Sequence, residues 1–103
     1  MDETLALATV QYKNNEYGVA VKTLSLREIF CKVKEISRSE FYQAKQQNLQ
    51  AEYMFEIFYA DYEHETLLKY DDTLYTIYRT FRRGDRLEIY AQRRLGDEFN
   101  GYV

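Results

Sequence analysis

The sequence predicts a mainly β fold, a small antiparallel β-barrel or barrel-like sandwich of about six strands with one short α-helix inserted near residues 38–48. The first observation is that residues 52–90 hold three runs rich in aromatic and β-branched residues, separated by turn signals. This stretch contains no proline and a single glycine, Gly84. The second observation is a helix-start signal at Ser37. Closure of the sheet is expected because it leaves no exposed strand edges.

Each of the three runs places its apolar side chains on one face by the strand period of two. The residues expected to face inward are Tyr53, Phe55, Ile57 and Tyr59 in the first run, Tyr75, Ile77 and Phe81 in the second, and Leu87, Ile89 and Ala91 in the third. Asp71-Asp72 and Arg83-Gly84-Asp85 mark chain reversals, since Asp tolerates turn geometry and Gly supplies a positive φ. We therefore expect three consecutive strands that form a meander around one core.

The first half of the chain is less regular. Residues 4–12 have strand composition, although their Ala and Leu content also fits a short helix, and we interpret them as a strand. Residues 18–26 fit either an edge strand or an ordered loop. Residues 28–36 alternate well, which predicts a strand with three inward side chains: Ile29, Cys31 and Val33.

A capping box predicts where the helix begins. Ser37 and Glu40 have the S-x-x-E spacing in which Ser accepts from a backbone N–H and Glu reaches back to the cap. The helix should end near Asn48, a residue that tolerates the left-handed conformation. The side chains expected to face the sheet are Phe41, Ala44 and, as a further candidate, Tyr42.

Length and composition indicate one domain, residues 1–103. The chain is 46% hydrophobic and 17% aromatic, so it should fold alone. No apolar run approaches the roughly 18 residues of a membrane span, and the acidic start MDETLALATV is unlike a secretory signal, so we expect no membrane association and a cytosolic protein. Residues from about 96 show no periodicity, and we expect a flexible C-terminal tail there until a partner holds it.

No residue pattern predicts a catalytic site, a metal site or a cofactor. Cys31 is the only cysteine, which excludes an internal disulfide, and its apolar neighbours favour a core position. His64 is either a general base flanked by Glu63 and Glu65 or part of a polar loop, and the loop is favoured because no nucleophile accompanies it. Asp71-Asp72 fits a hairpin tip better than a metal site, since no third oxygen ligand stands at a defined spacing.

Charge is distributed unevenly along the chain. The net charge is −3, yet residues 52–72 carry seven acids against Lys69 alone, and residues 79–94 carry six arginines against Asp85 and Glu88. Arginines next to Tyr78 and Tyr90 could form a surface for single-stranded nucleic acid, but the acidic segment would repel phosphates. In a ring, an acidic patch of one subunit can instead meet a basic patch of the next.

Several stretches carry a resemblance to a known family. They are Arg27 to Val33, Ser37 to Ala44, Ala60-Asp61-Tyr62, Lys69-Tyr70, Leu74 to Thr80, Asp85 to Tyr90 and Leu95-Gly96. In order and spacing the chain resembles the head-closure (head-tail joining, or stopper) proteins of long-tailed bacteriophages. The resemblance covers nearly the whole chain and is a pattern of core and turn positions without a catalytic motif.

The resemblance implies a non-enzymatic virion subunit, assembled in the cytoplasm of the host bacterium and placed at the head-tail interface. Such subunits form a homo-oligomeric ring between the portal/adaptor complex and the tail. They close the channel of the packaged double-stranded DNA without reading its sequence, and they dock a tail terminator or tail-completion protein. The isolated chain is expected to be a monomer, because no long apolar stretch drives obligate association. The alternative is a small barrel that binds single-stranded nucleic acid or a cytosolic protein, and a hydrolase is a distant third.

Within this interpretation, charge suggests roles for two residue sets. The set expected at the subunit or adaptor interface is Arg82, Arg83, Arg93 and Arg94. The set expected to line or plug the channel, where basic groups would trap DNA, is Glu63, Glu65, Asp71 and Asp72. Two other segments are alternative plugs: Asn14-Asn15-Glu16 and Gln46-Gln47-Asn48.

Overall fold

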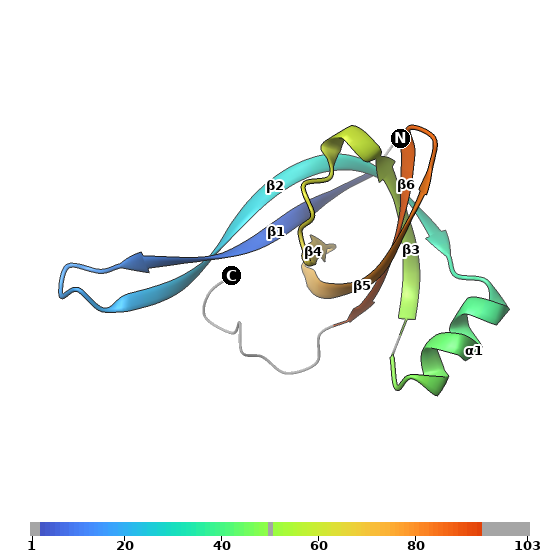
Figure 1. Ribbon diagram of the computed structural model, residues 1–103, viewed down its shortest axis with the longest axis horizontal. Helices are drawn as coiled ribbons and strands as arrows, with labels where there is room; N and C mark the ends of the chain where they lie inside the picture. Colours follow the sequence, from blue (N-terminus) through green and yellow to red (C-terminus); the bar gives the residue numbers. More distant parts are fainter. Residues whose placement is uncertain (1–2, 50, 94–103) are drawn as a thin grey trace.

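A computed structural model describes residues 3–49 and 51–93 of the protein. This part of the chain forms a closed antiparallel β-barrel with one α-helix beside it (Figure 1). The elements in this part of the chain are β1 (Glu3–Asn14), β2 (Ala20–Glu35), α1 (Arg38–Gln46), β3 (Ala51–Phe58), the 3-10 turn η1 (Tyr59–Asp61), β4 (Leu67–Tyr70), β5 (Thr73–Arg83) and β6 (Arg86–Arg93). The order around the barrel is β1-β2-β3-β6-β5-β4, and β4 closes back onto β1. The predicted fold class is confirmed.

The predicted meander is wrong in its strand order. The run predicted at Tyr53 to Tyr59 forms β3 as far as Phe58, with Tyr59 in η1, and β3 pairs with β6 and not with the next strands along the chain. After β3, the chain turns through η1 and crosses to the short strand β4, which pairs with β1 and β5 and so closes the barrel. Both predicted reversals are confirmed, with φ values of 51° at Asp71, 59° at Asp72 and 61° at Gly84.

The core fills the barrel interior with apolar side chains from all six strands. Phe55 is fully buried, with its ring centroid 5.2 Å from that of Tyr70 and 5.7 Å from that of Tyr75 in edge-to-face contacts, which favour aromatic pairing. The largest fully buried side chains are Phe55, Leu7, Ile57, Leu68, Ile89 and Cys31. The predicted inward positions on β3 and β6, and Ile29 and Cys31 on β2, are confirmed.

The predicted inward position of Phe81 is wrong because of a β-bulge in β5. The register with β6 shifts between Ile77 and Arg79, so Tyr78 is an extra residue on β5. One added residue reverses the side-chain phase of everything after it. Phe81 therefore pairs with Glu88 on the outer face and is 47% exposed.

A long two-stranded arm extends from the barrel. β1 and β2 pair from Glu3 opposite Cys31 to Asn14 opposite Ala20, whereas β4 pairs only with Ala6–Ala8 of β1 and β3 pairs only with β2 from Lys32 onward. In residues 9–26, which we call the arm, β1 and β2 therefore pair with no strand but each other, and the arm projects away from the barrel (Figure 1). Of the two predictions for residues 18–26, the strand is correct from Ala20 onward, but it is continuous with residues 28–35.

Helix α1 begins as predicted but presents a different face to the barrel. The Ser37 hydroxyl accepts a hydrogen bond from the Glu40 backbone N–H, and Asn48 ends the segment with a φ of 60°. Ala44 is buried, whereas Phe41 is 44% and Tyr42 57% exposed, so their predicted inward positions are wrong. The cause is Glu40, whose carboxylate does not return to the cap but bonds to β5, and so turns the Glu40–Ala44 face inward.

Candidate interaction surfaces

The acidic loop after η1 is fastened to β2 by one arginine. The Arg27 guanidinium lies 2.7 Å from the Glu65 carboxylate and 3.3 Å from that of Glu63, and it donates to the Asp61 carbonyl at 2.6 Å. The Glu65 side chain is 7% exposed, while that of Glu63 is 71% exposed. Of these two predicted channel residues, Glu65 is therefore committed to holding the loop, and Glu63 faces solvent.

Electrostatics within this loop follow from the same ion pair. Burial acts to raise the pKa of Glu65, but the hydrogen bonds from Arg27 and from backbone N–H groups outweigh it and lower the pKa below its ordinary value. Burial and the Glu65 charge raise the pKa of Tyr62, whose hydroxyl donates to the Glu65 carbonyl at 3.0 Å. His64 is exposed with a φ of 65°, and its ring contacts Tyr62 edge-on. The predicted polar loop at His64 is confirmed.

The other two predicted channel residues lie apart from this loop. Asp71 and Asp72 form the exposed turn between β4 and β5, so the whole of β4 separates them from Glu63 and Glu65. The structure thus divides the predicted acidic set between the two ends of β4. Within residues 3–49 and 51–93, no group of three His, Cys, Asp or Glu side chains is placed to hold a metal ion.

The predicted basic set is also divided. Arg82 and Arg83 lie at the β5–β6 turn, Arg93 is the last residue of β6 at its far end, and Arg94 lies outside the described residues, as does the tail expected from about residue 96. The Arg82 guanidinium stacks 3.8 Å from the Tyr59 ring centroid, and its Nε donates to the Gly84 carbonyl at 2.8 Å. Arg83 Nε donates to the Glu88 carboxylate at 2.9 Å.

Much of the charge asymmetry of the sequence is neutralised within the fold. Glu56 on β3 lies 3.4 Å from Lys34 and 3.5 Å from Arg86, and Arg79 on β5 pairs with Glu40 on α1. Glu88, which is 8% exposed, pairs with Arg83. Removing the partner of such a carboxylate leaves a poorly solvated charge. Arg83 therefore has a structural role that the sequence did not reveal.

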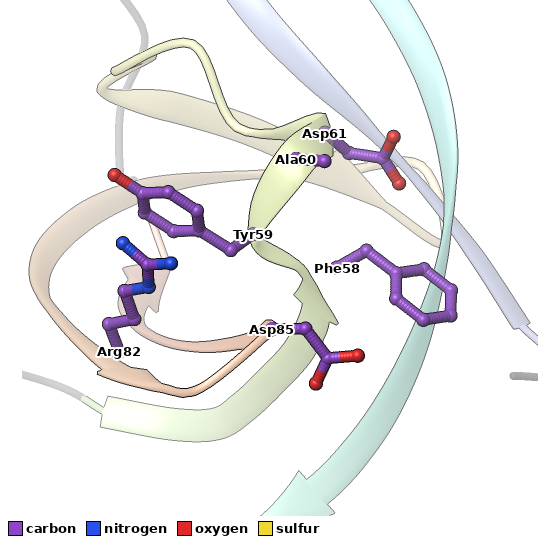
Figure 2. A pocket seen from close by; sticks show the side chains of 6 residues that line it. All are labelled: Phe58, Tyr59, Ala60, Asp61, Arg82 and Asp85. Carbon is purple, nitrogen blue, oxygen red and sulfur yellow. The ribbon is translucent and has the colours of Figure 1, made fainter.

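The end of the barrel near the β5–β6 turn is hollowed. A hollow of about 470 Å³ lies here. Figure 2 shows the side chains that line it: Phe58, Tyr59, Ala60, Asp61, Arg82 and Asp85. The Tyr59 backbone N–H donates to the Asp85 carbonyl at 2.8 Å, which ties η1 to the turn. In Figure 2, Arg82 lies beneath the Tyr59 ring, and the Asp85 carboxylate lies on the side of Phe58. The lining combines one stacked cation with aromatic rings, an arrangement suited to contact with a partner surface.

The arm is the feature that the sequence analysis missed. Its exposed apolar residues are Tyr12 at 66%, Tyr17 at 80%, Val19 at 57%, Val21 at 38% and Leu26 at 47%. Alternation of apolar residues at positions 8, 10 and 12 and at 24 and 26 was a signal for a one-sided ribbon. Neither strand alone shows the ribbon, because its one-sided character appears only when residues 8–12 of β1 pair with residues 22–26 of β2.

Comparison of the sequence with protein-family models finds no match, and comparison with curated proteins finds none either. Within residues 3–49 and 51–93, no helix has the length and apolar character needed to cross a membrane.

Proposed function

We propose that this protein is the head-closure subunit of a long-tailed bacteriophage, a structural protein that forms a ring between the portal/adaptor complex and the tail. The observation that carries the proposal is the family resemblance of the sequence. The fold supports it, because the stretches that carry the resemblance coincide with structural elements: Arg27 to Val33 lies in β2, Ser37 to Ala44 spans the helix cap and most of α1, and Leu74 to Thr80 lies in β5.

A ring built by rotation needs two different surfaces on each subunit. The barrel is the rigid body of the proposed ring, and its surfaces differ on its several sides: the arm on one, α1 on another, and the Arg82 hollow at the barrel end. The partners proposed for these surfaces are further copies of the chain, the portal/adaptor protein and the tail terminator or tail-completion protein. The closed channel holds double-stranded DNA without sequence-specific contacts.

The contacts within the chain refine the roles of the charged residues. Arg82 is exposed and lies beside the hollow at the barrel end, so it is the arginine we assign to a neighbouring subunit or the adaptor. Glu63, Asp71 and Asp72 are exposed and remain the residues assigned to the DNA channel, where acidic groups let the duplex slide. Glu65 and Arg83 are instead paired within the chain, and Glu63 stays exposed although it too lies near Arg27.

The experiment uses purified filled heads of the phage or prophage that encodes the chain, made without this subunit. These heads should fail to join tails and should lose DNA, and added wild-type protein should restore joining, with a ring visible below the portal by electron microscopy. Heads that retain DNA and join tails at the normal level without the subunit would contradict the proposal.

The same assay tests the basic surface. Arg82→Glu should reduce joining at least about tenfold, because like charges placed across an interface repel. Lys32→Glu, the same change of charge at an exposed position of β2, is the matched control and should join normally. Arg83→Glu is unsuitable as a test because it would place a second carboxylate against Glu88 and destabilise the barrel.

Binding of single-stranded nucleic acid is the second candidate function, favoured by the arginines and aromatic rings on a small barrel. Three of these rings are already covered on one face by a guanidinium: Tyr59 by Arg82 at 3.8 Å, Tyr90 by Arg79 at 4.0 Å and Phe58 by Arg86 at 4.6 Å. We therefore expect no salt-dependent binding of a labelled oligonucleotide by the purified protein. Tight binding that weakens with added salt would favour this second function.

A further inference from the structure

The arm is an amphipathic ribbon. On one face, polar residues of β1 and β2 lie opposite each other, with Thr9 across from Ser25 and Gln11 across from Thr23. The other face is mainly apolar: Ala8 lies across from Leu26 and Val10 from Leu24, while Tyr12 lies across from the charged Lys22. At the barrel this face joins a small cluster that contains Leu67 and Leu74.

The outer part of the arm has no cover from its own barrel. Tyr12 is 66% exposed and Tyr17, in the turn at the tip, is 80% exposed. Two strands alone are marginally stable in water. The tip is nevertheless well ordered by hydrogen bonds, since the Asn15 side chain accepts from the backbone N–H groups of Tyr17 at 2.8 Å and Val19 at 3.0 Å. An ordered tip that exposes an aromatic ring is suited to insertion into a partner.

A matching hollow is lined mainly by residues of helix α1. Helix α1 lies on the other side of the barrel from the arm (Figure 1). The hollow is open, has a volume of about 510 Å³ and is lined by Ile36, Arg38, Phe41 and Tyr42. The Phe41 and Tyr42 rings meet edge-on, with centroids 5.8 Å apart, and both are largely exposed. Arg38 forms no ion pair with any of the residues that the structure describes. The hollow thus combines aromatic rings with a free cation.

The arm tip offers the complementary groups. Glu16, beside Tyr17, is the only acid in residues 9–26, and it too forms no ion pair within the described part of the chain. We propose that the arm tip of one copy docks into the α1 hollow of the next copy, with Tyr17 against Phe41 and Tyr42, and Glu16 paired with Arg38. Because the two surfaces lie on opposite sides of the chain, the contact is head-to-tail and can be repeated around a ring.

The size of the contact explains why it would be weak alone. Full burial of an aromatic side chain covers roughly 150–250 Å², so the tip covers only part of the roughly 800 Å² per partner of a stable interface. Copies gathered on a portal would reach a high effective concentration and close the ring there. That this contact closes a ring on the portal rests on the proposed function, whereas the contact itself can be measured with the purified chain.

The test uses two charge reversals, Glu16→Arg and Arg38→Glu, in sedimentation runs at roughly 0.1–1 mM, where weak association is measurable. Wild-type protein should associate, and each variant alone should associate at least about tenfold more weakly because like charges meet at every contact. An equimolar mixture of the two variants should regain association, since every contact between unlike copies then pairs Arg with Glu. Glu28→Arg, at an exposed acid of β2 outside the arm, is the control and should behave as wild type.

A mixture that stays as weak as the single variants would overturn the proposal, and so would wild-type protein that remains monomeric over the whole range. A loss of head binding by Glu16→Arg, with self-association unchanged, would assign the arm to another protein and also overturn it. The mixing result does not depend on the phage assay: restored association together with heads that join tails without the subunit would remove the proposed function and leave the contact standing.

Discussion

The Arg27 Nη2 atom on β2 donates to the Glu65 Oε2 atom in the loop before β4 at 2.7 Å, although 38 positions separate the two residues in the sequence. This ion pair holds the segment that carries the chain from β3 across the barrel to β4. The crossing is what places β3 next to β6 and lets β4 close the barrel. A single side-chain contact thus supports the step at which the fold departs from a simple meander.

The first prediction follows from this pair. Arg27→Gln should lower the free energy of unfolding by about 1–3 kcal/mol, because the Glu65 carboxylate is left poorly solvated without its charged partner. Urea denaturation measures the change. The double variant Arg27→Gln with Glu65→Gln should recover part of the loss, and a double variant no more stable than Arg27→Gln alone would show that the pair is not coupled.

The pH dependence of stability gives the second prediction. The pKa of Glu65 is lowered in the folded protein, so the native state binds fewer protons than the unfolded state near that pKa. The stabilisation is therefore complete above the ordinary carboxyl pKa and is lost as the pH falls through the lowered value. The stability difference between wild type and Glu65→Gln should shrink on acidification. A difference that stays constant from neutral to acidic pH would contradict the lowered pKa.

Cys31 provides the third prediction. Burial, followed by the charge of Glu3, raises the pKa of this thiol to about 11, so very little thiolate exists at neutral pH. The side chain is also fully buried. A thiol reagent should therefore react with the native protein at least about 100-fold more slowly than with the protein in urea, at a rate set by opening of the barrel. Equal rates in both states would show that Cys31 is accessible.

Alternation in the sequence predicted β1, the second half of β2, β3, β5, β6 and most of the core, because the period of two is a local property of extended chain. It did not predict the short strand β4, nor that residues 20–35 form one continuous strand. It failed at Phe81, since the bulge at Tyr78 is selected by packing across the sheet and leaves no mark in the local pattern. It also could not place β3 beside β6, because strand order depends on contacts distant in sequence. The capping box predicted the helix start because the cap is a contact between residues close in sequence. The buried face of the helix could not be predicted in this way, because it depends on the bond between Glu40 and β5, which is distant in sequence.

The candidate surfaces were harder to predict than the fold. Counting charges along the chain indicated an acidic half and a basic half, but ion pairs such as Arg79 with Glu40, 39 positions apart, neutralise much of the difference. Which arginines remain free depends on these long-range pairs. Arg82 and Arg83 are adjacent in sequence and both exposed, but Arg83 pairs with the Glu88 carboxylate whereas the Arg82 side chain donates only to the Gly84 carbonyl.

A fourth prediction compares two apolar residues of the β5–β6 hairpin. Leu87 is 3% exposed and faces the core, so Leu87→Ala should cost about 2–5 kcal/mol. Phe81 lies on the outer face and is 47% exposed. Phe81→Ala should therefore lower the free energy of unfolding much less than Leu87→Ala, although Phe81 is the larger side chain. Denaturant midpoints of the two variants give the comparison. A larger loss at Phe81 than at Leu87 would contradict the outward orientation of Phe81.

The last prediction concerns the attachment of α1 to the barrel. The Tyr78 hydroxyl donates to the Glu40 carboxylate at 2.9 Å, and burial together with this bond raises the pKa of Tyr78, so the phenol remains a donor at all working pH values. Tyr78→Phe keeps the ring but removes the bond, which should cost about 0.5–1.5 kcal/mol. Because the bond joins α1 to β5, amide exchange should quicken in α1 and remain unchanged in β6.

Tyr78→Phe also tests whether self-association depends on the position of α1 and not only on the side chains that line the hollow. If the arm tip docks on the α1 hollow, Tyr78→Phe should weaken self-association even though it changes no residue that lines the hollow. Tyr59→Phe is the control. It removes the hydroxyl of the ring on which Arg82 stacks, and it should leave both amide exchange in α1 and self-association unchanged. Faster exchange throughout the barrel in Tyr78→Phe would instead assign Tyr78 to global stability, because a helix held by a local bond loosens on its own.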